Sequence, residues 1–531
     1  MTAPLAASRP EGPPRRAPSG RVPALGAAFC LVWALAASPA VNAGPEGGRD
    51  ARPPASTASP QEPLAQPQAE APASGQARLK KPDMSKPPAV EPHISERLPF
   101  RMRWRLPNGF ETVLVEDGRL PLVTARLVIR SGWAAVPSDL AGLADAMAEL
   151  LTEGTVRRTA REIADAAQDY GGRVSAKAGP DSIVIEASCL SDRSERMLAL
   201  LAEVARFPTF PWNEVQLRKK NMKEELLAKR ADDDFLSAVA FFKRFYRSHP
   251  YAVTAPTEAS IAAIGRKHIV AFHKKLFTPR NATLVLVGDI GYEVALKPIQ
   301  AHFGQWKGVS EPVEAPAVIG GHDSRKVYLV DRPGSSQVTV FMGNFAVRPD
   351  HPQYYGLLAA GQVLGGSFSS RLTRDIRESK GWTYQIWSRL DHRLTSSIFQ
   401  VRSPLRSESA LDALKAVFRH LEGMRDRGVT EAELEKAKGF LVGGFAVELE
   451  TQAGLADALV TQKILRLPDD YYDSYADRVA GVTAESVGKA AQTFIRPEEM
   501  TVVVVGEAAK LKDGLAKFSE FPVIVVDQDG N

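Results

Sequence analysis

The residue types that bind metals or act as nucleophiles are present in this chain, but their spacing does not make a catalytic centre. The nine histidines stand at positions 93, 249, 268, 273, 302, 322, 351, 392 and 420. No two are four residues apart, the spacing that puts two imidazoles on one helix face. The segment Gly365-Gly366-Ser367-Phe368-Ser369 does not fit the Gly-x-Ser-x-Gly nucleophile elbow. The residue pattern therefore indicates no self-sufficient catalytic centre.

The sequence predicts both strands and helices as the elements that would position any site. Apolar, β-branched runs predict strands over 110–115, 122–129, 172–178, 182–189 and 282–287. Apolar residues at helical spacing predict helices over 141–151, 194–205, 212–230, 235–246 and 267–277, and Thr159 begins another that ends at Gly171-Gly172. Strands followed by runs of helices are typical of an α+β fold.

One helix–turn–strand unit occurs twice. The segment from Pro279 to Asp289 contains Pro, Thr, an apolar strand, Gly and an acidic residue, and the segment from Pro497 to Glu507 repeats that order. An amphipathic helix precedes each copy. The repeat predicts two homologous halves. We expect the halves at 96–310 and 325–510, a linker at 311–324 within a Pro/Gly-containing stretch, and a C-terminal tail at 511–531.

The N-terminal stretch has the composition of an export signal and a tether. Arg15, Arg16 and Arg21 precede an apolar run over 24–37, and Val41-Asn42-Ala43 offers a small-x-small cleavage site. We expect a signal peptide over 1–43, with an uncleaved anchor as the alternative, and an exported, periplasmic or extracytoplasmic location. Residues 44–95 are rich in Pro, Ala, Gln and Ser, which predicts a disordered tether.

Composition excludes some classes of protein. The net charge of +5 over 531 residues, without a dense basic stripe, argues against nucleic-acid binding. No apolar run beyond the N-terminal one is long enough to span a membrane. Removal of Cys30 with the signal would leave Cys189 alone, and its alternation with Ile183, Ile185 and Ala187 predicts a buried core residue.

Several short motifs together resemble the insulinase/pitrilysin family of zinc peptidases. They include Leu106-Pro107-Asn108-Gly109, Gly142-Leu143-Ala144, Glu153-Gly154-Thr155, His249-Pro250-Tyr251 and Val287-Gly288-Asp289. The resemblance spans about residues 98–510. It implies the same two-half α+β fold, with each half a largely antiparallel sheet packed with helices. It also implies an enclosed chamber that four such halves form in one chain or two.

The zinc motif of that family is missing from the matching positions. Active members carry His-x-x-Glu-His there, whereas this chain has Asp145, Ala148 and Glu149. The family's third ligand matches Glu225, or Glu224 if the register is shifted by one. Such a set does not hold catalytic zinc, which takes three protein ligands and a water. Asp145, Glu149 and Glu225 would instead be solvated carboxylates, or less plausibly a Mg²⁺ or Ca²⁺ site.

The second half keeps the family's other functional segment. Gly365 to Leu372 leads into Ile376-Arg377-Glu378 and Gly381-Trp382-Thr383-Tyr384. The resemblance implies that Arg377 and Tyr384 contact the substrate carbonyl in a facing zinc site, where their N–H and O–H donors would stabilise an oxyanion. The structural alternative is a surface ion pair for Arg377 and a core position for Tyr384.

The residue pattern and the resemblance together leave three functions open. The first is a zinc-lacking subunit, inactive alone, that supplies Arg377, Tyr384 and chamber walls to a homologous zinc-bearing partner in peptide hydrolysis. This chain would need no cofactor, and zinc would belong to the partner. The second is an exported binding or scaffold protein without a proteolytic role. The third is an independent metallopeptidase that recruits imidazoles such as those of His249 or His273.

Overall fold

The computed structural model describes residues 98–308, 316–317, 324–518 and 522–531. The expected signal peptide and tether lie outside these residues, as does most of the expected linker. The N half contains the strands β1 (Met102–Arg105), β2 (Glu111–Glu116), β3 (Leu122–Ile129), β4 (Arg173–Ala178), β5 (Ile183–Leu190) and β6 (Ala282–Gly288). Its helices are α1 (Leu143–Leu150), α2 (Ala160–Asp169), α3 (Ser194–Arg206), α4 (Trp212–Lys229), α5 (Asp233–Tyr246), α6 (Glu258–Ala263), α7 (Arg266–Leu276) and α8 (Tyr292–Phe303).

The C half has a similar order of elements, except that its edge strand comes last in the chain. Its strands are β7 (Lys326–Asp331), β8 (Gln337–Ala346), β9 (Trp387–His392), β10 (Ser397–Arg406), β11 (Thr501–Gly506) and β12 (Ile524–Val526). Its helices are α9 (Tyr354–Gly365), α10 (Ala410–Arg427), α11 (Glu431–Leu449), α12 (Gln452–Ile464), α13 (Tyr475–Ala480), α14 (Ala484–Phe494) and α15 (Ala508–Leu515). A π-helical segment, Thr373–Ser379, follows α9.

Five strands of each sheet share one topology, which confirms the predicted α+β fold of two similar halves. The edge strands differ, because β1 pairs antiparallel with β2 and β12 pairs parallel with β7. The strand orders are β1-β2-β6-β3-β5-β4 and β12-β7-β11-β8-β10-β9. The repeated segment supplies the third strand of each sheet, parallel to one neighbour and antiparallel to the other. Both copies are buried along their whole length, as expected for strands covered on both faces. Strand β12 lies within the stretch expected to be a tail and pairs with β7 at the sheet edge.

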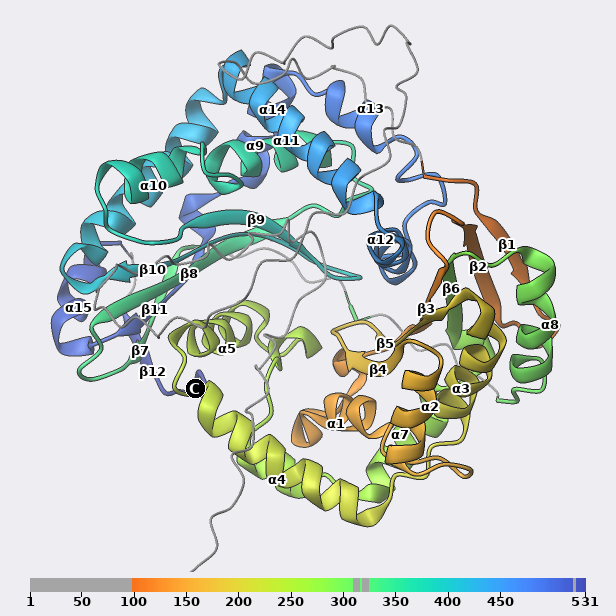
Figure 1. Ribbon diagram of the computed structural model, residues 1–531. Coiled ribbons are helices and arrows are strands. Elements are labelled where there is room, and N and C mark those ends of the chain that lie inside the picture. The colour runs from red at the N-terminus through yellow and green to blue at the C-terminus, as the bar shows by residue number, and fades with distance from the viewer. Residues whose placement is uncertain (1–97, 309–315, 318–323, 519–521) are drawn as a thin grey trace, which may run out of the picture.

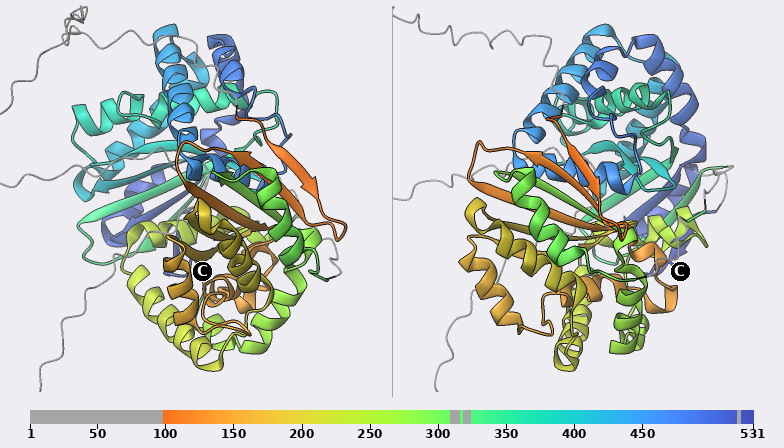
Figure 2. Two further views of the ribbon diagram at one scale, coloured as in Figure 1. Left: turned by 45° about the vertical axis from the view of Figure 1, so that its right-hand side comes forward. Right: turned by 90° about the vertical axis from the view of Figure 1, so that its right-hand side faces the viewer.

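One helix of each half packs against the sheet of the other half (Figures 1 and 2). Helix α5 of the N half packs against β8 and β11, and helix α12 of the C half packs against β3 and β6. The ring of Phe241 in α5 stacks on Phe341 in β8 with centroids 3.7 Å apart. Burying such aromatic surface is a large part of core stability. The two sheets therefore complete each other's cores.

Polar contacts fix the exchanged helix α12 on the N-half sheet. Arg126 in β3 pairs with Asp457 in α12 at 3.0 Å, and Lys463 in α12 pairs with Glu111 in β2 at 2.8 Å. Both cations are largely buried, with side-chain exposures of 9% and 14%. Buried charges require such partners, so these pairs specify where α12 sits.

The turn between β9 and β10 is inserted into the N half. Arg393 in this turn is buried, and its guanidinium carbon lies 4.4 Å, 5.1 Å and 5.0 Å from the ring centroids of Phe242, Tyr246 and Tyr251. Asp181 of the N half accepts hydrogen bonds from the Tyr251 hydroxyl at 2.6 Å and from the turn's backbone N–H at Leu394, 2.9 Å away. An aromatic cage around a desolvated cation is favourable, so this turn connects the halves.

Cys189 is buried on the inner face of β5, as predicted. Burial raises the pKa of its thiol to about 12. The thiolate is the reactive form, so this residue serves as a small core side chain.

Candidate functional site

The residues that match the lost zinc motif lie on α1 and α4, which contact each other. Gly142 precedes α1 with a φ of 91°, a left-handed conformation that favours glycine. Asp145 and Glu149 follow one turn apart on the same helix face, and Ala148 is fully buried. Helix α4 supplies Glu225. The structure thus brings the predicted acidic side chains into one neighbourhood.

The space between two of these carboxylates is filled by Arg218. Its Nη1 atom donates to Glu225 Oε1 at 2.7 Å, and its Nη2 atom donates to Glu149 Oε1 at 2.7 Å. The Arg218 side chain is only 11% exposed. Forked hydrogen bonds from a guanidinium to carboxylates are among the strongest in proteins. The carboxylates are therefore paired with a cation of the chain itself and are not the freely solvated groups expected from the sequence.

Asp145 lies deeper in the same neighbourhood. Burial is the main cause that raises the pKa of its carboxyl to about 6, and the nearby Lys229 and Arg218 oppose this rise. Burial also raises the pKa of Glu149, although Arg218 counteracts it. The acids therefore depend on the surrounding cations to remain charged at neutral pH.

These residues do not fit a zinc ion. Within residues 98–308, 316–317, 324–518 and 522–531, no group of three or more His, Cys, Asp or Glu side chains is arranged to hold a metal. Glu224 points away and pairs with Lys220 at 3.8 Å, with two-thirds of its side chain exposed, so Glu225 is the residue in the matching register. Ala148 has no group that could take a proton from water.

The two histidines considered as replacement ligands are engaged elsewhere. His249 Nδ1 accepts from the backbone N–H of Tyr251 at 3.1 Å, so its Nε2 donates to the Ala317 carbonyl at 2.8 Å. His273 Nε2 lies 2.9 Å from the Ala205 carbonyl. Burial lowers the pKa of His273 to about 4. Neither imidazole joins the α1–α4 neighbourhood in this structure, so these two residues are not placed as replacement ligands.

Arg377 lies in the π-helical segment of the C half. Its guanidinium carbon is 5.1 Å from the ring centroid of Phe368, and its Nε is 3.4 Å from the adjacent Glu378. The Arg377 side chain is 36% exposed, whereas the Phe368 ring is 72% exposed. The ion pair with Glu378 contributes little to stability, because the Glu378 side chain is 60% exposed. The Arg377 donors therefore remain available to a ligand.

Tyr384 projects from an anchored stretch of backbone. Gly381, at a φ of 63°, ends the helical segment. Thr383 is buried and bonds the Gln385 and Pro404 carbonyls, and Ile386 is buried on the other side. Tyr384 itself is 79% exposed, so its alternative assignment as a core aromatic is wrong. The fold presents this hydroxyl to the outside.

Two residues of the site were not predicted. Arg218 precedes Glu225 by seven residues, which is two helical turns and the same face of α4. An arginine two helical turns from an inward-facing glutamate indicates an ion pair within the helix, and this spacing could have predicted the role of Arg218. Phe368 carries no such signal, because its exposure depends on how the 365–370 turn is held.

Gly365 lies where α9 approaches β9. A Cβ atom at this position would lie 2.5 Å from the backbone nitrogen of Ser388. Glycine therefore lets α9 approach β9 closely.

The fold and the site together define a two-half peptidase-like protein whose metal centre is replaced by an internal ion pair. Residues 112–252 match the family model described as insulinase (peptidase family M16), and residues 263–441 match that of the peptidase M16 inactive domain. The chain belongs to this insulinase-like M16 family and lacks its zinc motif.

Three comparisons illustrate the relationship. The uncharacterized zinc protease YmxG of Bacillus subtilis is 24% identical over 76% of this chain and 97% of its own length. The non-peptidase homolog YmxG of Helicobacter pylori is 23% identical over 75% of this chain and 92% of its own. The peptidase M16 inactive domain from Pseudomonas fluorescens superimposes with a TM-score of 0.71 at 25% identity, covering 77% of this chain and 98% of that one.

None of the helices in the described ranges combines the length and the apolar character needed to cross a bilayer.

Proposed function

We propose that this chain is the zinc-lacking subunit of a heteromeric M16 peptidase, exported together with a homologous zinc-bearing partner. The observation that supports it is an asymmetry within the chain. The centre on α1 and α4 is filled by Arg218, with its donors committed to Glu149 and Glu225. The segment with Arg377 and Tyr384 keeps exposed donors that no core contact requires.

In this proposal the partner holds the zinc and the general base, and this chain binds and orients the peptide. The Arg377 guanidinium donates N–H groups to the scissile carbonyl oxygen, and the Tyr384 hydroxyl donates an O–H. Such donors matter most where negative charge develops on that oxygen. The remaining surface of the two halves would form walls of the chamber that excludes folded proteins.

The test is peptide cleavage by the purified chain, alone and mixed with a zinc-bearing homologue. We expect chelator-sensitive activity only in the mixture. Arg377→Ala with Tyr384→Phe should lower kcat/KM about 100-fold or more, the range for lost oxyanion donors. Arg374→Ala is the matched control, because Arg374 is an exposed arginine of the same segment, and it should change kcat/KM by less than about 3-fold.

A second candidate is a binding or scaffold protein, which the similarity to a non-peptidase homologue favours. It predicts a stable complex with the partner whose activity does not change in the Arg377/Tyr384 double variant. Chelator-sensitive cleavage by the chain alone would instead reject both candidates and establish an independent peptidase.

A further inference from the structure

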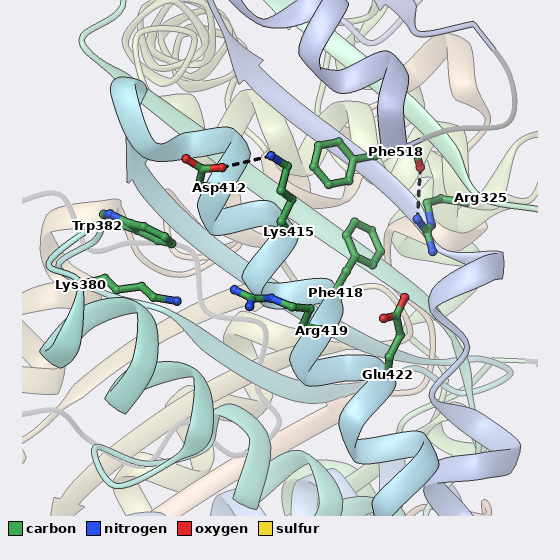
Figure 3. Close-up of a pocket in the computed structure, with 9 residues that line it drawn as sticks. All are labelled: Arg325, Lys380, Trp382, Asp412, Lys415, Phe418, Arg419, Glu422 and Phe518. Carbon is green, nitrogen blue, oxygen red and sulfur yellow. Dashed lines mark hydrogen bonds and ion pairs between the residues drawn. The ribbon is translucent and has the colours of Figure 1, made fainter.

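The C half contains a cavity of about 740 Å³ beside α10 (Figure 3). Aromatic and basic side chains share its lining, chiefly Lys380, Trp382, Lys415, Phe418, Arg419 and Phe518. Its volume is within the usual range for sites that bind small molecules or short peptides. None of these residues belongs to the α1–α4 centre.

The apolar part of the cavity is rigidly held. The rings of Phe418 and Phe518 stack with centroids 5.9 Å apart. The Arg325 guanidinium covers Phe418 at 4.0 Å from its centroid and donates to the Pro497 and Phe518 carbonyls at 2.7 Å and 3.2 Å. Arg325 is therefore structural, and the stacked rings are a preformed apolar surface.

The other end of the cavity is cationic. Lys415 pairs with Asp412 at 3.1 Å, but both side chains are more than half exposed, so the pair is weak. In the described part of the chain, the Arg419 side chain has no hydrogen bond or ion pair to any residue. Figure 3 shows its side chain extending toward the loop with Lys380 and Trp382. Like charges gathered around one space attract an anion.

Glu422, the other acid of the lining, points to the far side of the cavity. In Figure 3 it extends on the Arg325 side of the cavity, whereas Arg419 points toward the loop with Trp382. Glu422 therefore does not neutralise Arg419, whereas Asp412 and Asp375 pair with Lys415 and Lys380.

We propose that this cavity binds an acidic peptide segment. A carboxylate of the peptide pairs with Arg419, which offers a forked donor, and Lys415 turns from Asp412 to a second carboxylate. An adjacent apolar side chain packs against Phe418 and Trp382. The choice of a peptide among anionic ligands rests on the proposed function.

The cavity touches the segment that carries the carbonyl-binding residues. Lys380 and Trp382 lie between Arg377 and Tyr384 in the chain. Asp375 holds this segment to α10 because it accepts from Lys380 and bonds His420, each at 2.9 Å. A peptide in the cavity therefore slows amide hydrogen exchange in residues 377–384.

The test is fluorescence anisotropy with the full chain and a fluorescein-labelled octapeptide of alternating Glu and Leu. We expect saturable binding that weakens as salt is raised. Arg419→Gln with Lys415→Gln should weaken it about 10-fold or more, from the loss of two charged contacts. The matched control, Arg161→Gln with Lys436→Gln, removes the same charge from exposed positions outside the cavity and should change the Kd by less than 2-fold.

Equal binding of a Gln/Leu octapeptide, or unchanged binding by the Arg419/Lys415 variant, would overturn the proposal. Displacement of the peptide by an equal concentration of citrate would also overturn it, since it would make the cavity a small-anion site. The assay needs neither proteolysis nor a partner. A failure here therefore leaves the proposed function standing, and failed complementation with intact binding rejects only the proposed function.

Discussion

Arg218 and Glu225 lie two turns apart on α4, and a guanidinium nitrogen of the first is 2.7 Å from a carboxylate oxygen of the second. The same guanidinium reaches Glu149 on α1 at 2.7 Å. One protein cation thus supplies the positive charge between two helices that a metal ion supplies in active members of the family. The two helices that carry the matching positions are therefore joined by an ion pair of the chain itself.

The first prediction concerns Arg218→Ala. The variant leaves Glu149, Glu225 and Asp145 without their shared cation, so the free energy of unfolding at pH 7 should fall by about 1–3 kcal/mol. The exposed carboxylates should also gain affinity for Ca²⁺ or Mg²⁺, which prefer oxygen ligands. Urea denaturation and calorimetric titration with each cation measure the two effects.

Two variants make that prediction specific. Arg218→Lys keeps a positive charge in place and should bind no divalent cation, while Glu225→Gln added to Arg218→Ala should remove the acquired binding. If Arg218→Ala unfolds at the same urea concentration as the native chain, the ion pair does not contribute as the geometry indicates.

The second prediction concerns Asp145 and pH. Its folded pKa of about 6 lies above the ordinary value of 3.8, so the folded state binds the proton more tightly than the unfolded state. The stability from this group is fully present below pH 3.8 and is lost as pH rises through 6. Asp145→Asn should therefore match the native chain near pH 4 and exceed its free energy of unfolding by about 1–3 kcal/mol at pH 8.

Thermal and urea unfolding at pH 4, 6 and 8 test this dependence. Asp513→Asn is the control, because Asp513 is exposed on α15 and its substitution should have the same small effect at every pH. A gain for Asp145→Asn that is equal at pH 4 and pH 8 would contradict burial as the cause of the pKa shift.

Local sequence patterns predicted the helices and strands well, but they predicted less well which of these elements pack against each other. The repeated segments at Pro279 and Pro497 predicted two similar halves because each is a complete helix–turn–strand unit. The amphipathic pattern of α5 shows that one face is buried, but it does not say which sheet covers that face. Phe241 packs against Phe341, about a hundred residues later in the chain. Only the tertiary structure shows this contact. The same holds for Arg218, whose partner Glu149 lies on another helix.

The third prediction concerns the turn that joins the halves. Arg393→Met removes a buried guanidinium from its cage of Phe242, Tyr246 and Tyr251 and leaves Asp391, 3.7 Å away, without it. Breaking such a buried pair from one side costs about 3–5 kcal/mol. Urea denaturation should show this loss, and hydrogen exchange should quicken at the β9–β10 turn.

Arg389→Met is the control, in the strand β9 that leads into this turn. Arg389 is only partly buried and stacks on Trp387 at 4.3 Å, so its loss should cost less than about 1 kcal/mol. Equal losses for the two arginines would show that the cage has no special part in holding the halves together.

The fourth prediction concerns the exchange of α5 and α12. A fragment of residues 98–308 lacks the α12 cover of its sheet, and a fragment of residues 324–531 lacks α5. Each should therefore expose an apolar sheet face and aggregate when expressed alone. Refolded together, they should form a soluble one-to-one complex, which light scattering after gel filtration detects.

The stacked pair Phe241 and Phe341 decides whether that complex forms by the native exchange. Phe241→Ala in the N fragment removes this contact between the fragments and should weaken their association by about 3–5 kcal/mol, the range for a buried phenylalanine. Phe100→Ala in the same fragment is the matched control, because Phe100 is 81% exposed and should leave association unchanged. Fragments that are each soluble and monomeric would show instead that every half carries a complete core, and that α5 and α12 only dock halves that are already folded.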